Sequence, residues 1–324
     1  MKDANIGQTR IIIDTDIGGD PDDATAIALA LASPELTIEG ITTVYSDVEY
    51  HARRVSRLFE RSGGRRYPIY NGLSQTLLRN RDVSWTSAAD TMEGGEREAG
   101  DGADAGGDML DGGEQPEDAG RAVDFIIRTI MNEPGQITMI CIGPLTNMAA
   151  AIIVEPRIAA RVKEIILMGG VTRLGSGGAE LPAVEHNIKC DPEAASVVFA
   201  SGAPIVMVGL DVTRKATIGR QECAWLIGSG KPVNAALADV IERWLRRIGA
   251  DCTPMHDPLA LALAIDRTLA TTRRMRVQVE YDHREGTGRT AAFPDPQGTV
   301  DVCLDVDAGR FLDLLFGRLC QKGW

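Results

Sequence analysis

Short runs of β-branched and other apolar residues recur along the chain, and each is followed by a stretch with helical spacing. The runs predict strands at 10–13, 37–44, 137–142, 164–168 and 205–209, and the stretches predict helices at 22–32, 50–61, 119–132, 144–155, 192–201, 235–247 and 258–264. Strands that alternate with helices indicate a mostly parallel sheet with helices on both faces. We therefore predict an α/β fold with an open, doubly wound, Rossmann-like sheet, and we expect residues 1–324 to form a single domain.

The composition limits the kinds of partner that such a domain can have. The chain has 324 residues and a formal net charge of −12 at pH 7. Nucleic-acid backbones bind basic surfaces, so we expect no nucleic-acid partner. No stretch approaches the roughly 20 uninterrupted apolar residues that a membrane span needs, and the first ten residues contain no apolar signal segment. We therefore expect a cytoplasmic protein that binds a small molecule and no membrane.

Closely spaced aspartates follow the first predicted strand. Asp14 and Asp16 alternate at the end of the strand, and Asp20, Asp22 and Asp23 lie around the start of the next predicted helix. Asp20 could be only the cap of that helix, with Asp22 and Asp23 placed to suit its dipole. That interpretation leaves Asp14 and Asp16 unexplained, because they lie where open α/β sheets gather their ligands. Carboxylates packed this closely repel one another unless a cation lies among them, so the segment predicts half of a site for a hard divalent metal.

Two further polar groups occur later in the chain. Glu185 and Asn187 are two residues apart, so in an extended segment they would face the same side and suit the hydroxyls of a sugar. A solvated loop edge would have the same sequence. His256 and Asp257 precede another predicted helix, where Asp257 is by itself a good helix cap and the pair could be only structural.

One segment interrupts the alternation of strands and helices. Residues 88–118 are crowded with Gly, Asp and Glu, and Arg97 is their only basic residue. Such a composition buries too little apolar surface to order itself, so we predict a long mobile surface loop. A loop of this length could be a lid over a site or a tolerated insertion.

Taken in order, these motifs resemble those of the calcium-dependent nucleoside hydrolases of the inosine-uridine-preferring group. The resemblance rests on residues 14–18 with 22–24, 143–147, 164–170, 185–187 with 191–195, and 256–258. It extends from about residue 11 to about residue 265, and five separate motifs in the same order make a chance match improbable. The resemblance implies hydrolysis of the N-glycosidic bond of ribonucleosides to free base and ribose.

The resemblance also implies a metal site and two catalytic groups. The implied ligands of a calcium ion are the carboxylates of Asp16, Asp23 and Asp257 and the backbone carbonyl of Ile142. A calcium-bound water would attack the sugar with Asp16 as the general base, and His256 would protonate the leaving base. Calcium takes about 6–8 oxygens, which leaves positions for water and for the sugar diol.

The remaining implied roles concern the substrate and the assembly. Asp22, Asn187 and Asp257 would hold the ribose 2′- and 3′-hydroxyls, and Glu185 the 5′-hydroxyl. Met168 is a further implied substrate contact, and Asp14 would support the ligands from behind. The resemblance further implies a homodimer or a homotetramer.

The chain departs from the family pattern at several places. Asp47 stands where the family has an asparagine near the nucleoside, which replaces two donors by a charge. Two extra residues lie between Asp16 and the pair Asp22 and Asp23, so Asp20 competes for the ligand role. Residues 85–98 lack the expected histidine, and Ala179 replaces an asparagine near the 5′ end of the sugar. These departures leave the metal and diol residues in place and leave the side of the site that would bind the base unspecified.

Two other functions are compatible with parts of the sequence. Asp14 and Asp16 at a strand end also resemble the aspartate-based phosphatases, in which the first Asp is a nucleophile. That pattern does not explain Glu185 or His256. Alternatively, the changes on the base side could leave a non-catalytic ribonucleoside-binding protein on the same scaffold.

Overall fold

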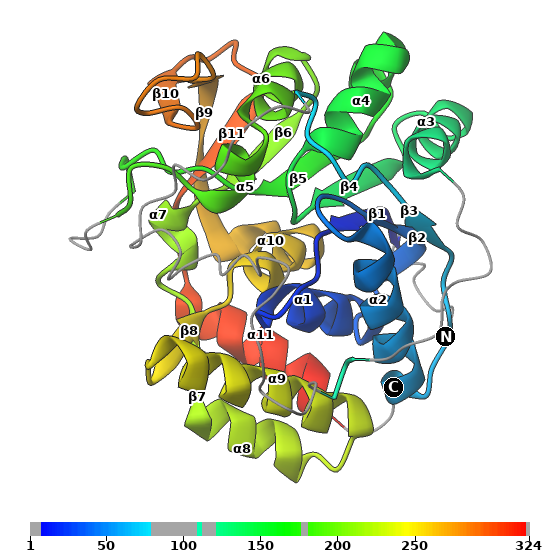
Figure 1. Ribbon diagram of the computed structural model, residues 1–324. Helices are drawn as coiled ribbons and strands as arrows, with labels where there is room; N and C mark the ends of the chain where they lie inside the picture. Colours follow the sequence, from blue (N-terminus) through cyan, green and yellow to red (C-terminus); the bar gives the residue numbers. More distant parts are fainter. Residues whose placement is uncertain (1–7, 79–108, 112–120, 176–180, 322–324) are drawn as a thin grey trace, which may run out of the picture.

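A computed structural model describes residues 8–78, 109–111, 121–175 and 181–321 of the chain (Figure 1). Its centre is a nine-stranded sheet with the strand order β10-β9-β11-β6-β5-β4-β1-β2-β3. The strands are β1 (Thr9–Thr15), β2 (Leu36–Thr43), β3 (Ile69–Asn71), β4 (Ile137–Cys141), β5 (Glu164–Met168), β6 (Ile205–Val208), β9 (Ala270–Val279), β10 (Thr290–Pro294) and β11 (Val300–Val306). The run from β11 to β3 is parallel, and β9 and β10 add an antiparallel edge. The predicted mostly parallel α/β sheet is confirmed.

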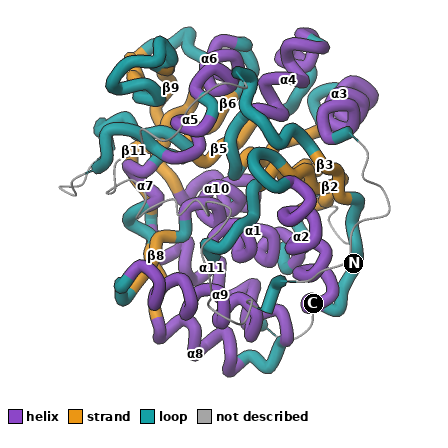
Figure 2. The backbone as a smooth tube through the Cα atoms, in the orientation of Figure 1, coloured by secondary structure: helices purple, strands orange, loops and turns teal. Residues whose placement is uncertain are grey.

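Helices cover both faces of this sheet (Figure 2). On the side of one face lie α1 (Asp22–Leu31), α2 (Val48–Ser62), α8 (Arg220–Gly228), α9 (Pro232–Ile248), α10 (His256–Ile265) and α11 (Ala308–Cys320). Within this group α8 packs on α9 and α11, farther from the sheet (Figure 1). The other carries α3 (Ala122–Asn132), α4 (Thr146–Val154) and α6 (Pro192–Ala200). The side chains of β1 alternate between the two cores, because Ile11 and Ile13 pack on the first face and Ile12 on the second.

Smaller elements complete the fold. Two short helices, α5 (His186–Cys190) and α7 (Leu210–Thr213), follow β5 and β6, and β7 (Thr217–Gly219) pairs with β8 (Cys252–Pro254) in a separate two-stranded sheet. Short 3-10 helices occupy Pro156–Ala160 and Arg267–Leu269. No helix among the described residues is both long and apolar enough to cross a membrane.

The strand order reverses at one point within the sheet. β2 and β3 extend from one side of β1, whereas β4, β5 and β6 extend from the other. The order therefore reverses between β1 and β4, and ligands of open α/β sheets bind beside the carboxyl ends of strands at such a point. Asp14 and Asp16 lie at the end of β1 and Ile142 directly after β4, so the fold places predicted site residues from distant segments at this reversal.

Candidate active site

The first turn of α1 buries acidic side chains instead of presenting them to solvent. Asp22 is 7% exposed and Asp23 is 3% exposed, although both open the helix. The residue at the cap position is Pro21, and no side chain caps the helix. The interpretation of Asp20 as a helix cap is therefore wrong. Thr15 Oγ1 donates a hydrogen bond to Asp23 Oδ1, which fixes this carboxylate against the end of β1.

A second helix brings Asp257 to the same place. α1 and α10 pack side by side (Figure 1), and Asp257 lies in the first turn of α10 with only 3% of its surface exposed. Because α10 begins at His256 and Met255 occupies the cap position, the prediction that Asp257 caps the helix is wrong. Burial, followed by the charges of Asp22 and Asp23, raises the pKa of Asp257 well above its usual value.

The pKa values of the other acids in this region are raised as well. Burial raises the pKa of Asp16 to about 7; the charge of His186 opposes this rise, and that of Asp20 adds to it. Burial and then neighbouring carboxylates also raise the pKa values of Asp22 and Asp23. Like charges in a low-dielectric site disfavour ionisation, so ionising these carboxylates together costs free energy unless a cation lies among them. The carboxylates of β1, α1 and α10 therefore form one interacting group.

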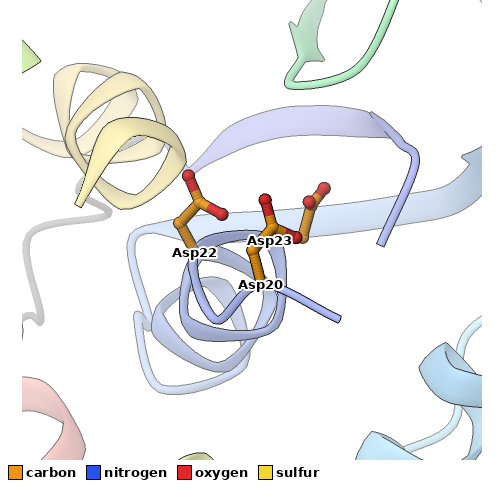
Figure 3. A group of neighbouring side chains, drawn as sticks. All are labelled: Asp20, Asp22 and Asp23. Carbon is orange, nitrogen blue, oxygen red and sulfur yellow. The ribbon is translucent and has the colours of Figure 1, made fainter. Parts of the chain in front are cut away.

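The donor atoms in this region suit a hard divalent cation. Carboxylate oxygens of Asp20, Asp22 and Asp23 lie within 4.8 Å of one another, and Figure 3 shows them on one side of the first turn of α1. Asp22 Oδ1 is buried and has no hydrogen-bond partner. Oxygen-only donors and an orphaned carboxylate oxygen are consistent with a site for Ca²⁺ or Mg²⁺.

Asp14 lies near the end of β1 and is hydrogen-bonded to side chains from two neighbouring segments. Its Oδ1 accepts hydrogen bonds from Thr42 Oγ1 at 2.5 Å and Asn147 Nδ2 at 2.8 Å. Asn147 also donates to the Thr43 carbonyl and accepts from the Leu73 backbone N–H. Burial raises the pKa of Asp14 to about 7, while the hydrogen bonds from Thr42 and Asn147 oppose the rise. The structure thus places Asp14 in a buried hydrogen-bond network with Thr42 and Asn147. The sequence analysis contained Asn147 only as part of the motif 143–147.

Asn187 connects the ends of β4 and β5. Its Nδ2 lies 3.0 Å from the Ile142 carbonyl oxygen and 3.2 Å from that of Met168, and it donates to both. Its side chain is 6% exposed, and Ile142 and Met168 are buried as well. A carbonyl oxygen has two lone pairs, so Ile142 retains capacity for a second partner. The amide therefore sits directly beside the predicted carbonyl ligand.

Glu185 precedes Asn187 but is held differently from the prediction. Its carboxylate caps α5, accepting hydrogen bonds from the backbone N–H groups of Asn187 and Ile188 at 2.7 and 3.0 Å. It also accepts from the Gly170 N–H at 2.8 Å and is 3% exposed. The predicted extended segment is wrong, because α5 starts at His186, and the alternative of a solvated loop edge is wrong because both side chains are buried.

Close backbone approach sets the position of Asp16. A Cβ atom on Gly143 would lie 2.8 Å from Asp16 Oδ1, 3.0 Å from Asp16 N and 2.9 Å from Val44 Cγ1. Such contacts are shorter than packed atoms adopt. Gly143 is therefore required for β1 and the turn after β4 to come this close, a role that the sequence did not reveal.

His256 lies next to Asp257 and contacts a residue of α7. Its Nδ1 is 2.6 Å from Thr213 Oγ1. Burial, followed by the charge of Arg214, lowers the pKa of His256 to about 4, so the imidazole is neutral near pH 7. With the hydroxyl as donor to Nδ1, the remaining ring proton lies on Nε2.

Asp47 and His51 lie at the start of α2. Asp47 is exposed and caps the helix, accepting a hydrogen bond from the Tyr50 N–H at 2.9 Å. The nitrogens of the buried His51 ring are 2.7 Å from the Ile17 carbonyl oxygen and 3.0 Å from that of Tyr45. His51 therefore ties α2 to the turn after Asp16, a connection that the sequence analysis missed. Most of the predicted loop 88–118, the segment 85–98 and Ala179 lie outside the described residues.

Comparison with known proteins finds relatives among the nucleoside hydrolases. Residues 11–313 match the family described as inosine-uridine preferring nucleoside hydrolase. The pyrimidine-specific ribonucleoside hydrolases RihA of Citrobacter koseri and Escherichia coli are 33% and 34% identical, each over 95% of this chain and 97% of the relative. A solved purine-preferring ribonucleoside hydrolase from Gardnerella vaginalis superposes with a TM-score of 0.80 at 31% identity, covering 96% of this chain and 98% of that one.

Proposed function

The chain belongs to the inosine-uridine preferring nucleoside hydrolase family and hydrolyses ribonucleosides to the free base and ribose, and we propose that it does so with Asp16 as general base and Ca²⁺ as its metal. The residues proposed to hold the ion are Asp16, Asp23 and Asp257, together with the Ile142 carbonyl. The observation that carries the proposal is the convergence of carboxylates from the turn after β1 and from the first turns of α1 and α10 at the reversal of strand order. When bound there, the ion orients a water molecule and lowers its pKa.

The protein residues account for the other requirements of the reaction. Cleavage of the N-glycosidic bond passes through an oxocarbenium-like sugar, and a carboxylate-rich pocket stabilises its positive charge. Asp16 takes the proton of the attacking water. Asp22, Asn187 and Asp257 hold the ribose 2′- and 3′-hydroxyls, Glu185 holds the 5′-hydroxyl, and Met168 contacts the substrate. Because this binding fixes the anomeric carbon against the water, much of the rate acceleration comes from orientation.

The carboxylate of Glu185 retains the capacity that this role requires. Its oxygens accept three backbone N–H bonds, whereas a carboxylate offers about four lone-pair sites. The same bonds fix the carboxylate rigidly, so a sugar hydroxyl would meet a preorganised acceptor. Asp47 is proposed as a contact on the base side.

Chelation of the metal tests the proposed function directly. The purified protein is incubated with purine and pyrimidine ribonucleosides, since relatives are named for both, and with a phosphate ester, with and without a calcium chelator. We expect release of base and reducing sugar that stops on chelation and returns with added Ca²⁺. Base release that persists in the chelator would exclude the metal role. Tight nucleoside binding without release would support the binding-protein alternative, and phosphate release would support the phosphatase.

His256→Ala is expected to lower kcat by about 100-fold while calcium affinity stays unchanged, because a positioned proton donor contributes about that much. The lowered pKa of His256, about 4, fixes the sign of the pH dependence. Above pH 5 the wild-type imidazole stays neutral and donates from Nε2, so the loss in kcat should be the same from pH 5.5 to pH 8. A loss that shrinks tenfold per pH unit above pH 5 would instead identify a protonated imidazolium as the acid.

We also propose a cellular location and an oligomeric state for the enzyme. We place it in the cytoplasm as a homodimer or homotetramer, because closed symmetric assemblies are the common state of such enzymes. Sedimentation velocity of the purified protein measures the assembly, and a monomer at micromolar concentration would contradict that part of the proposal.

A further inference from the structure

Asp20 is an acidic side chain of the site for which the described structure offers no protein partner. It lies in the turn between β1 and α1, partly exposed, and it does not cap α1. None of the described residues forms a hydrogen bond or an ion pair with its carboxylate. The guanidinium near this turn belongs to Arg247, which stacks on the Trp244 ring at 5.8 Å. Neither helix capping nor ion pairing therefore explains the position of Asp20.

The surroundings of Asp20 are themselves acidic. Its carboxylate faces Asp22 and Asp23 from the first turn of α1, with oxygens of all three within 4.8 Å (Figure 3). Asp20 also interacts electrostatically with Asp16, which follows β1, and with Asp257 on α10. A helix dipole stabilises a negative charge at an exposed end only weakly, and this stabilisation is small beside the repulsion of several close carboxylates.

The spacing of these oxygens suits coordination of one ion. Calcium binds oxygen at 2.3–2.6 Å, so two ligand oxygens on opposite sides of the ion are about 5 Å apart. An oxygen of Asp20 and one of Asp23, the proposed ligand on α1, lie within 4.8 Å of each other, so the two side chains can share an ion without rearrangement of the backbone. An independent indication is Asp22 Oδ1, which is unpartnered on a side chain that is 7% exposed.

We propose that Asp20 is a direct ligand of the bound cation in this chain, in addition to the carboxylates expected from the family. The inference rests on the proposed metal-dependent hydrolysis and concerns the ligand set of the same ion. It gives a use to the two residues inserted between Asp16 and the pair Asp22 and Asp23. An additional anionic oxygen raises cation affinity and replaces one coordinated water.

Terbium luminescence tests this ligand assignment without depending on catalysis. Tb³⁺ is an oxygen-seeking substitute for Ca²⁺, and its luminescence lifetimes in H₂O and D₂O count the water molecules on the bound ion. Asp20→Ala is expected to add about one coordinated water and to weaken Tb³⁺ binding by about tenfold, since ligand number and charge set affinity in such sites. Asp20→Asn keeps an oxygen donor, so it should weaken binding while the water count stays at the wild-type value.

Asp124→Ala is the matched control, because Asp124 is an exposed acid in the first turn of α3. It should bind Tb³⁺ like the wild type. An unchanged water count in Asp20→Ala, whether or not affinity falls, would overturn direct ligation. Circular-dichroism melting in chelator verifies that each variant is folded. Nucleoside hydrolysis is assayed in parallel: calcium-dependent turnover with an unchanged water count refutes only the Asp20 assignment, whereas wild-type turnover that ignores chelation refutes the proposed function.

Discussion

Asp16→Asn is expected to lower kcat for ribonucleoside hydrolysis by about a thousandfold at saturating Ca²⁺, because a general base contributes roughly 10²–10⁴-fold. Asparagine keeps the shape and one oxygen donor of the side chain but cannot accept the proton of the attacking water. Asp16 lies at the carboxyl end of β1 and interacts electrostatically with Asp23 and Asp257, so one substitution affects both proton transfer and metal binding. Steady-state kinetics across a calcium titration separates these two effects.

The calcium titration also shows which result would contradict the role of Asp16 as general base. If excess Ca²⁺ restored the wild-type kcat, Asp16 would be a metal ligand only and the general base would be another residue. Asp124→Asn removes the same charge from the first turn of α3, away from this group, and should leave kcat within experimental error. A similar loss in that control would point to net charge instead of position.

Gly143→Ala is expected to reduce kcat by about 100-fold, since a displacement of about 1 Å at a reacting group can cost that much. The added Cβ would lie 2.8 Å from Asp16 Oδ1, so either the carboxylate or the turn after β4 must move. Overpacking of this kind costs about 1–3 kcal/mol of unfolding free energy. Steady-state kinetics measures the first effect, and chemical denaturation measured in chelator measures the second.

Gly228→Ala provides the matched glycine control. Gly228 ends α8, and no atom outside its immediate chain surroundings lies within 4 Å of the position of an added Cβ. This variant should keep wild-type kcat and lose no stability, because alanine is at least as favourable as glycine in a helix. If Gly143→Ala behaved like Gly228→Ala, the tight approach of β1 and the turn after β4 would not control the position of Asp16.

The elements that the sequence predicted best are those with strong local patterns. The strand at 164–168 appears unchanged as β5, and the helix at 235–247 lies within α9, which runs from Pro232 to Ile248. The antiparallel edge was not predicted, because β9 carries Arg273, Arg274 and Arg276 and buries only alternate residues near its end. The helix α11 was also missed, although Phe311, Leu315 and Leu319 have the spacing of a buried helical face.

Some residues of the candidate site could likewise be predicted from the sequence, and others could not. Asp14, Asp16 and the pair Asp22 and Asp23 could be selected from the sequence because acids follow directly after a β-branched strand. The functions of Gly143 and Asn147 could not, because each depends on contacts between strand ends that are distant in the chain. The sequence also suggested the wrong backbone for Asn187, which is helical in α5, since a carboxylate that caps a short helix and one that begins an extended segment have the same local sequence.

By itself, the sequence determined that this protein alternates strands with helices, and that acidic side chains collect where the first strand ends. Those properties follow from side-chain shape and from periodic burial, which act over a few neighbouring residues. Only the tertiary structure decided that β4 lies beside β1 and that α10 packs on α1, which brings Ile142 and Asp257 to Asp16. Strand order and helix packing depend on covering both faces of one sheet, a requirement that no local segment contains.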